Sequence, residues 1–383
     1  MAKRPPIAAL CAREFVESTG REPAVVSWAP GRINLLGGHT DYNDGLALPG
    51  AIDRWISVSM SPRSDDEIRV RSLDFGGELR GRRGSVEPTQ ASWTRFVAGS
   101  IAVFEETHPL PSGFEAVFAG DVPDGAGLSS SAALTVAWMT ALRAWSEASI
   151  DDISLVRMAQ QVEHRFLGVK CGLLDQIGSL MAEPGGVLLV DFKDLSISPI
   201  ADGLEGVHWV VLHSGVRREL ASSAYLERVQ ECADALAAVQ RRESGIDSIR
   251  DLDVSMLRCE HAIERRLRHV LTENERVLRG AEAVRSGDAE RLGAILSQAH
   301  ISLRDDYRVS CPQLDWLVES ATAQPDCFGA RMVGGGFGGC TLNLVRAEQS
   351  DAFIVRALSA YRSRCNEVPR AFTFELVGGA STG

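Results

Sequence analysis

The chain has 383 residues, of which 45% are hydrophobic and 24% are charged, and its formal net charge is -11. Its length exceeds the size at which one hydrophobic core usually stops growing, so two domains are expected, and its composition excludes extensive disorder. The negative charge would repel a polyphosphate strand, which argues against a nucleic acid as partner.

The cysteines and the apolar segments point to a reduced, non-membrane protein. The eight cysteines lie far apart without a CxxC pair, so we expect free thiols rather than a metal cluster. The first residues lack the apolar core of a signal peptide, which predicts a cytoplasmic location. The longest uncharged apolar stretch, 132–142, is about half of the roughly 20 residues that span a membrane, so a buried helix is expected there.

The first half of the chain alternates strand and helix patterns. A helix is predicted over 7–18, and a strand over 24–29 that enters a loop at Pro30 and Gly31. Alternation between 52 and 73 predicts two antiparallel strands joined by a turn at 64–66. A strand over 114–119, a glycine-serine loop, and helices over 132–148 and 154–166 follow.

The second half shows the same mixture, with neither a repeat nor a low-complexity linker. Strands are predicted over 186–192, 207–213, 327–332 and 340–345, and helical patterns over 222–242, 274–297 with an interruption at 287–288, and 351–362. A glycine-rich loop occupies 334–339. The predicted class is α+β, with an N-terminal domain over 1–200 and a C-terminal domain over 201–383.

The central glycine-serine loop has the composition of a phosphate-binding loop. It consists of Gly125, Ala126, Gly127, Leu128, Ser129, Ser130, Ser131 and Ala132. Glycines let backbone amides approach an anion, the following helix presents free N–H groups, and serine hydroxyls bind phosphate or Mg²⁺. A serine N-cap after a flexible turn is the structural alternative. The loop lacks the Gly-Lys-Ser/Thr ending of a Walker A motif and is not the dinucleotide fingerprint.

This loop resembles the phosphate loop of the GHMP superfamily, which contains the galactokinases and the homoserine, mevalonate and phosphomevalonate kinases. A narrower resemblance is to the galactokinase family: residues 30–45 are similar to its N-terminal signature, and 170–176 to its catalytic segment. Further similar segments lie within 216–225, 302–312 and 332–340. The resemblance implies a two-domain GHMP-kinase-like fold, with mixed sheets, helices packed on them and the active site in the interdomain cleft.

The resemblance implies an ATP-dependent sugar 1-kinase that converts D-galactose to galactose 1-phosphate by direct in-line transfer. Asp175 matches the family's base beside the C1 hydroxyl, and Arg32 matches the arginine that pairs with it and stabilises the transferring charge. Phosphoryl transfer requires positioning and charge neutralisation. An ion-paired aspartate is a weak base, so orienting the hydroxyl matters as well. The structural alternative for Asp175 is a helix cap.

ATP and Mg²⁺ are the cofactors that the resemblance implies. Ser131 and Glu163 match the family's metal ligands, although a lone glutamate on a helix is also typical of a solvated surface. Gly335 and Gly336 belong to the loop that closes over the active centre in relatives, and alone they would indicate only a tight turn. A small sugar is the expected partner, and the protein is expected to be a monomer.

The sugar itself is the open question. His39, Asp41, Gly172 and Tyr225 match residues that hold the ring in relatives, whereas Gly38 replaces the glutamate that binds the O6 hydroxyl there. Two related kinases, for galacturonate and for L-arabinose, are similar to this chain in having a small residue at that position. Lys170 replaces a usual proline, and adds a cation near Asp175 or is a solvated loop lysine.

Two other classes of function remain as alternatives. Galactokinase-like sensors bind ATP and sugar without turnover, but the known ones have a shortened serine loop, and here residues 129–133 are intact. A homoserine or mevalonate kinase conflicts with the set His39, Asp41 and Tyr225.

Overall fold

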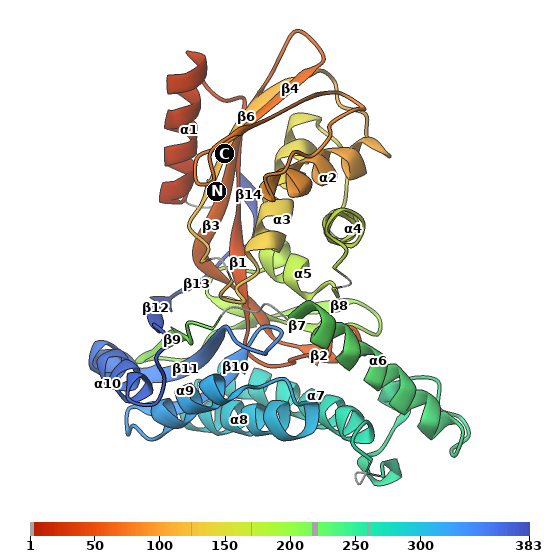
Figure 1. Cartoon of the computed structure of the whole chain (residues 1–383), viewed down its shortest axis with the longest axis vertical. Helices are drawn as coiled ribbons and strands as arrows, with labels where there is room; N and C mark the ends of the chain where they lie inside the picture. Colours follow the sequence, from red (N-terminus) through yellow and green to blue (C-terminus); the bar gives the residue numbers. More distant parts are fainter. Residues whose placement is uncertain (1–3, 124, 170, 217–220, 259–260) are drawn as a thin grey trace.

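The computed structural model describes residues 4–123, 125–169, 171–216, 221–258 and 261–383, without the side chains of 221–223. Lys170 and residues 217–220 of the sugar-kinase motif therefore lie outside the described residues. The molecule has two parts, each a mixed arrangement of β-sheet and packed helices (Figure 1). This is the two-domain α+β fold that the sequence predicts.

The N-terminal part is built on a seven-stranded sheet with the order β14-β1-β3-β6-β4-β5, in which β13 pairs with β3. Its strands are β1 (Val25–Asn34), β3 (Pro49–Pro62), β4 (Glu67–Ser72), β5 (Glu78–Arg82), β6 (Phe114–Gly120), β13 (Leu376–Val377) and β14 (Ser381–Thr382). Its helices are α1 (Pro6–Thr19), α2 (Trp93–Glu105), α3 (Ser130–Trp145), α4 (Asp152–Val162), ending in the π turn η1 (Glu163–Leu167), and α5 (Leu174–Met181). In Figure 1, α1 covers one face of this sheet and α2–α5 lie on the other.

The second part combines two smaller sheets with long helices. One sheet has the order β2-β7-β8, and the other β10-β11-β9-β12. The strands are β2 (Leu46–Ala47), β7 (Gly186–Asp191), β8 (Ser196–Ala201), β9 (Val207–His213), β10 (Cys327–Val333), β11 (Cys340–Arg346) and β12 (Arg370–Phe374). The helices are α6 (Ala221–Gln240), α7 (Glu264–Ser286), α8 (Ala289–Ser302), continued by the π turn η4 (Leu303–Tyr307), α9 (Pro312–Thr322) and α10 (Ser350–Arg362), with short 3₁₀ turns η2 (Ile249–Asp251), η3 (Val254–Met256) and η5 (Ala347–Gln349).

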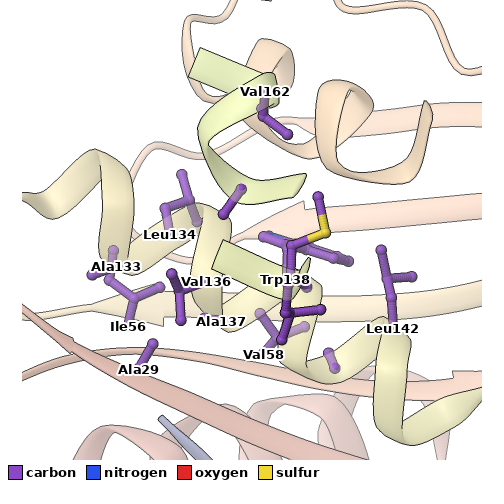
Figure 2. Packing of buried hydrophobic residues seen from close by; sticks show 14 of the residues in the cluster. Ala29, Ile56, Val58, Ala133, Leu134, Val136, Ala137, Trp138, Leu142 and Val162 are labelled. Atoms are coloured by element: carbon purple, nitrogen blue, oxygen red, sulfur yellow. The ribbon is translucent and has the colours of Figure 1, made fainter. Parts of the chain in front are cut away.

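The apolar stretch over 132–142 forms the centre of the N-terminal core. Trp138 and Ala137 of α3 are fully buried, and α3 lies on β1 and β3, from which Ala29 and Val58 point toward it (Figure 2). Helices α2 and α4 pack on α3 as well. A helix that is apolar on all sides must be enclosed in this way, so the predicted buried helix is confirmed.

The predicted loop at Pro30 and Gly31 is wrong, because β1 continues through both residues to Asn34. The strand pairs with β3 along this length, and its register shifts between Pro30 and Arg32. Proline cannot donate a ladder hydrogen bond, and a bulge is one of the places where a strand tolerates it. Arg32 is consequently mounted on a sheet strand rather than on a loop.

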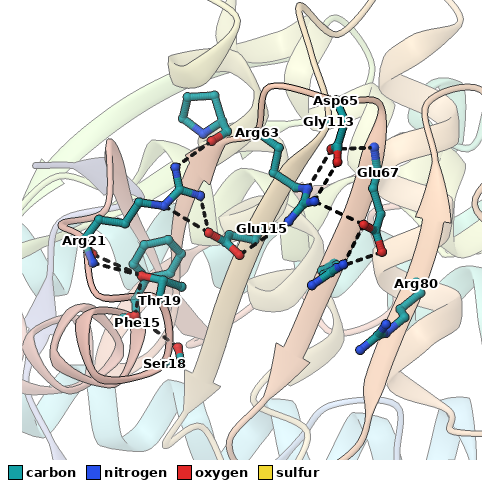
Figure 3. Close-up of polar contacts among 12 residues, drawn as sticks. Phe15, Ser18, Thr19, Arg21, Arg63, Asp65, Glu67, Arg80, Gly113 and Glu115 are labelled. Carbon is teal, nitrogen blue, oxygen red and sulfur yellow. Dashed lines mark hydrogen bonds and ion pairs between the residues drawn. The ribbon is translucent and has the colours of Figure 1, made fainter.

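The two antiparallel strands and the turn predicted between 52 and 73 are found as β3 and β4, but the strands do not pair with each other, because β6 lies between them. β6 is antiparallel to β3 and parallel to β4. Ion pairs link this region: Arg63 contacts Asp65 at 2.7 Å and Glu67 at 3.2 Å, and both Arg63 and Arg21 pair with Glu115 of β6 (Figure 3). Strand alternation indicates which face is buried but does not identify the neighbouring strand.

Helix α7 begins ten residues before the predicted start at 274, and several elements were not predicted: α2, α5, α9, β2, β5, β8, β12, β13 and β14. The other predicted helices and strands are found near their expected positions. No helix of the described residues combines the length and the apolar character needed to cross a membrane.

The last strands return to the N-terminal sheet. β14 pairs with β1 and β13 with β3, so the last strands of the chain join the sheet of the N-terminal part (Figure 1). The domain boundary near residue 200 stays a prediction.

Candidate active site

A cavity of about 290 Å³ is lined by residues from both parts of the molecule. Its lining includes the predicted site residues Arg32, Gly38, His39, Asp41, Ser131, Glu163, Asp175, Tyr225 and Gly335. These residues come from β1, the loop after it, α3, the end of α4, α5, α6 and the loop between β10 and β11. Residues spread over more than 300 positions of the sequence are therefore brought to one cavity.

The centre of the cavity is an ion pair between Asp175 and Arg32. The Nε atom of Arg32 donates to Oδ1 of Asp175 at 2.8 Å, and its Nη2 atom also contacts Oδ1. The hydroxyl of Ser129 donates to Oδ2, so both carboxylate oxygens are engaged. The Arg32 side chain is 9% exposed and that of Asp175 is 29% exposed, which leaves the carboxylate accessible from the cavity.

Two glycines allow this pairing. A Cβ atom on Gly178 of α5 would lie 3.1 Å from Cβ of Arg32, so the small residue lets α5 pack closely on β1. A Cβ atom on Gly31 would lie 2.8 Å from the carbonyl oxygen of Leu128, so the serine loop can also approach β1. That approach lets Nη1 of Arg32 donate to the Gly127 carbonyl at 2.9 Å.

The serine loop leaves the N-terminus of α3 uncapped. Ser129, the residue before the helix, has a left-handed backbone with φ of 58° and makes no capping hydrogen bond, because its hydroxyl is used by Asp175. The first N–H groups of a 16-residue helix are thus left for an anion. Ser131 reaches the cavity, whereas Ala126, Leu128 and Ala132 are buried in the core. The serine N-cap alternative is wrong.

Glu163 begins the π turn that ends α4, and it is buried beside the cavity. Its Oε1 atom accepts from Nε2 of Gln176 at 2.9 Å, and Oε2 lies 3.7 Å from the Cys171 sulfur. Burial, with the nearby negative charge of Asp175, raises the pKa of Glu163 to about 7. The solvated-surface alternative for Glu163 is therefore wrong.

The Mg²⁺ prediction can be compared with this donor set. No cluster of three or more histidine, cysteine or acidic residues is found among the described residues. Mg²⁺ commonly uses only one or two protein oxygens and takes the rest from phosphates and water. A buried carboxylate at Glu163 and a hydroxyl at Ser131, both lining the cavity, fit such an ion.

The loop after β1 forms another wall. His39 adopts a left-handed backbone with φ of 63°, and its Nδ1 atom lies 2.8 Å from the Tyr42 hydroxyl, which is 2.8 Å from that of Tyr307. The Tyr225 ring stands 5.6 Å from the ring of His39. These contacts fix the aromatic side of the wall.

Asp41 completes this wall together with Gly172. A Cβ atom on Gly172 would lie only 2.0 Å from Oδ2 of Asp41, so no larger residue fits while Asp41 keeps its position. Burial, followed by repulsion from Asp175, raises the pKa of Asp41 to about 7.

The glycine loop between β10 and β11 covers the cavity from the second part of the molecule. Gly334 and Gly335 line the cavity. Gly336 has φ of 82°, and a Cβ atom there would lie 2.2 Å from the Val309 carbonyl oxygen. Gly336 therefore supports the loop from behind.

Sequence reasoning missed two groups of residues. Asn34, Cys171 and Arg331 also line the cavity, and Arg331 was overlooked because it lies in a strand whose pattern is typical of the hydrophobic core.

A second pocket of about 230 Å³ adjoins the serine loop at Ser130 and Ser131. Its other lining residues are largely apolar and aromatic: Ile56, Phe75, Trp93, Phe96, Phe118, Val122 and Leu134. Only proximity in the fold shows that these aromatic residues lie beside the loop.

The sequence matches models of three known families. The galactokinase galactose-binding signature matches residues 13–62, the GHMP kinases N terminal domain 95–183, and the GHMP kinases C terminal domain 281–363. Galactokinase of Chloroflexus aggregans is 41% identical over 357 residues, covering 91% of each chain. Galactokinase of Homo sapiens is 40% identical over 363 residues, covering 90% of each.

Solved structures give the same picture for the fold. The crystal structure of Lactococcus lactis galactokinase complexed with galactose superposes with a TM-score of 0.91 at 29% identity, over 97% of this chain and 98% of that one. A mevalonate kinase structure superposes with a TM-score of 0.68 at 18% identity, which shows a shared fold alone. The likeness thus extends over nearly the whole length of the chain.

Proposed function

Because the chain belongs to the galactokinase family of the GHMP kinases, we propose that it transfers the γ-phosphoryl group of ATP to the anomeric hydroxyl of D-galactose. It is a phosphotransferase whose acceptor is a sugar hydroxyl. The donor, the position of transfer and the identity of the sugar are the proposed parts.

The observation that carries this proposal is the placement of Asp175. One of its oxygens is held by Arg32 and the other by Ser129, and the carboxylate borders a cavity of sugar size. In the proposed mechanism the carboxylate accepts a hydrogen bond from the C1 hydroxyl, orients it for in-line attack and takes its proton. Arg32 supplies positive charge where charge develops in the transition state.

The nucleotide is proposed to bind along the serine loop. The free N–H groups at the start of α3 and the hydroxyls of Ser130 and Ser131 are suited to the phosphates, and the adjoining aromatic pocket is suited to the base. Mg²⁺, which Ser131 and Glu163 would hold, supplies neutralisation of the phosphate charge. Gly334 and Gly335, which line the cavity from the second part of the molecule, are proposed to cover the transferring phosphoryl group.

The ring of the sugar is proposed to contact Asp41, His39 and Tyr225, with Gly172 allowing Asp41 to take its position. The chain matches the galactose-binding signature in the region that contains His39 and Asp41. This supports a galactose-like arrangement at O3 and O4 and leaves the C6 position open at Gly38.

Asp175→Asn tests the proposed mechanism. The amide keeps the size of the side chain but cannot take a proton, so we expect kcat to fall by roughly 10²- to 10⁴-fold. ATP binding, measured by calorimetry, should be retained. Asp66→Asn, at a surface aspartate that pairs with Arg83, is the matched control and should keep wild-type rates. A near-normal rate in Asp175→Asn would exclude Asp175 as the base.

An ADP-release panel tests the function itself. The sugars are galactose, galacturonate, L-arabinose, galactosamine and N-acetylgalactosamine, each with ATP and Mg²⁺. Turnover of galactose is the expected result. If no sugar releases ADP although ATP binds, the protein is a sensor of sugar and nucleotide rather than an enzyme.

A further inference from the structure

A buried arginine lies next to Gly38, the position where the family's glutamate is missing. Arg331 of β10 is 1% exposed and lines the cavity. Its Nε atom donates to the carbonyl of Met332 and its Nη1 atom to that of Leu35, each at 2.9 Å. Within the described part of the chain, no acceptor takes a hydrogen bond from Nη2. The guanidinium is therefore held firmly with one donor group unused.

The unused donor group faces the space where a side chain at position 38 would lie. A Cβ atom on Gly38 would be 3.0 Å from Nη2 of Arg331 and 3.3 Å from Cδ2 of Leu303. A glutamate at this position would bring its carboxylate beside the guanidinium and neutralise it. With glycine, the positive charge is left at the edge of the cavity that both residues line.

The neighbours of Arg331 do not fully compensate its charge. Glu273 of α7 accepts from Nε of Arg276 at 2.6 Å and from the Gly37 amide at 2.8 Å, and lies 3.7 Å from Nη1 of Arg331. Despite burial, these cations hold the pKa of Glu273 at about 2, so it carries one negative charge.

His269 of α7 lies in the same group of residues, with its Nε2 atom 2.9 Å from the carbonyl oxygen of Gly38, and it adds no positive charge. Burial lowers the pKa of His269 to about 4, so this residue is neutral near pH 7. The positive charges of Arg331 and Arg276 are thus balanced only in part by the single negative charge of Glu273. Among the residues that the structure describes, one buried positive charge remains without a counter-charge. Burying an uncompensated charge is costly, so an external anion would stabilise it.

The acidic residues of the cavity are coupled to a different cation. The charges acting on Arg331 are those of Glu273 and Arg276. Asp41 and Glu163 instead interact with Asp175 and Arg32. The cavity therefore has one region that holds Asp175 and another that presents Arg331.

We propose that Gly38 and Arg331 form a subsite for a carboxylate at C6 of the sugar, so that galacturonate, the C6 acid of galactose, is a substrate. This inference rests on the proposed function for the reaction and for the configuration of the ring. Nη2 donates to a carboxylate oxygen in a charge-assisted hydrogen bond, which is stronger than one to a neutral hydroxyl. L-arabinose has no C6 group and gains nothing from this subsite.

Steady-state kinetics with wild-type enzyme give the first test, with kcat/KM measured by ADP release for galacturonate, galactose and L-arabinose. We expect galacturonate to equal or exceed galactose, and L-arabinose to be lowest. A value for galacturonate below that for galactose overturns the inference alone. No ADP release with any sugar overturns the proposed function, and this inference with it.

A matched pair of variants isolates the charge at position 38. Gly38→Glu and Gly38→Gln fill the same space and require the same small shift of Leu303. They differ only in whether they neutralise Arg331 and repel a carboxylate. The ratio of kcat/KM for galacturonate to that for galactose should fall at least about tenfold further in Gly38→Glu than in Gly38→Gln. Equal ratios in the two variants overturn the role of charge at this subsite.

Arg331→Lys provides an independent comparison, because it keeps the charge but loses the fixed fork of donors. We expect kcat/KM for galacturonate to fall more than kcat/KM for galactose, so that the ratio of the two values decreases. Because Arg331 also binds the carbonyls of Leu35 and Met332, thermal melting must show that the variant is folded. If it is not, the two Gly38 variants decide the question.

Discussion

At the residue scale, Glu163 and Asp41, two buried carboxylic acids of the cavity with raised pKa values, make the stability of the protein depend on pH. The pKa of Glu163 rises from 4.5 and that of Asp41 from 3.8, both to about 7, chiefly because burial disfavours the charged form. At pH values between the unfolded-state and the folded-state pKa of each group, the folded state keeps a proton that the unfolded state has released. The contribution of these two groups to the free energy of unfolding therefore decreases as the pH rises through this window, and levels off above it.

Glu163→Gln should remove part of this pH dependence. The amide keeps the acceptor for Gln176 but does not ionise, so the decrease in unfolding free energy between about pH 4.5 and 7 should become smaller. Urea denaturation at several pH values, without Mg²⁺ or nucleotide, measures this. Subtracting the variant curve from the wild-type curve cancels the contributions of the groups that do not interact with Glu163. Parallel curves would contradict the raised pKa of Glu163.

Gly172→Ala should weaken sugar binding through Asp41. The added Cβ atom would lie 2.0 Å from Oδ2 of Asp41, so the carboxylate must move. We expect KM for the sugar to rise by about tenfold or more, with little change in KM for ATP. In an Asp41→Ala background the same substitution should add little, because the displaced atoms are absent. If Gly172→Ala raises KM for the sugar by the same factor in the wild-type and the Asp41→Ala backgrounds, Gly172 acts independently of Asp41.

At the element scale, the approach of α5 to β1 positions the ion pair of the site. Gly178 faces Arg32 and Pro49, with room only for a hydrogen atom or a slightly strained methyl group. The helix carries Asp175 in its first turn, and the strand carries Arg32. The geometry of the ion pair is therefore set by the distance between two backbones rather than by the side chains alone.

Gly178→Val should separate the two elements. Overpacking of this kind costs about 1–3 kcal/mol of stability, and α5 must move away from β1 to relieve it. We expect kcat and the melting temperature to fall together, with a smaller effect in Gly178→Ala. Kinetics and thermal melting of the two variants measure this series. A Gly178→Val enzyme with wild-type kcat would show that the spacing between α5 and β1 is not critical.

At the scale of the whole molecule, residues 376–383 tie the end of the described chain to the N-terminal sheet and to α5. Besides the pairing of β13 and β14, Gly379 donates to Ala182 at 2.7 Å and Ala380 to Ser179 at 2.9 Å. Deleting 376–383 exposes these backbone groups and the edge of β1. Several net hydrogen bonds of about 0.5–1.5 kcal/mol each are lost, so the melting temperature should drop by several degrees.

The truncated protein should also be inactivated at a lower temperature than the full chain. Because Ser179 and Ala182 belong to or follow α5, inactivation on heating should track the melting curve. Unchanged melting and inactivation would mean that the pairing of β13 and β14 contributes nothing measurable. Leu376→Ala removes one packed side chain but keeps residues 376–383 in the chain. Its melting temperature should therefore fall less than that of the truncated protein.

Much of the secondary structure follows from local patterns. The apolar helix α3, the interruption of the helices at Gly287, and strands β9, β10 and β11 agree with their predictions because periodicity and glycine act locally. The order of strands in the N-terminal sheet does not follow, since β6 enters between β3 and β4 from a distant part of the chain. Side-chain alternation carries no information about partners.

For the site, the family, the phosphate loop and the candidate residues Arg32, Asp41, Glu163 and Asp175 could be recognised without a structure, because short segments carry these features. That these residues line one cavity follows from the folded structure alone. The folded structure also revealed the aromatic pocket beside the serine loop and placed Arg331 against Gly38. The physical reason is that a contact between backbones far apart in sequence leaves no local pattern. An arginine buried in a strand is recognisable as part of a site only when its neighbours in space are known.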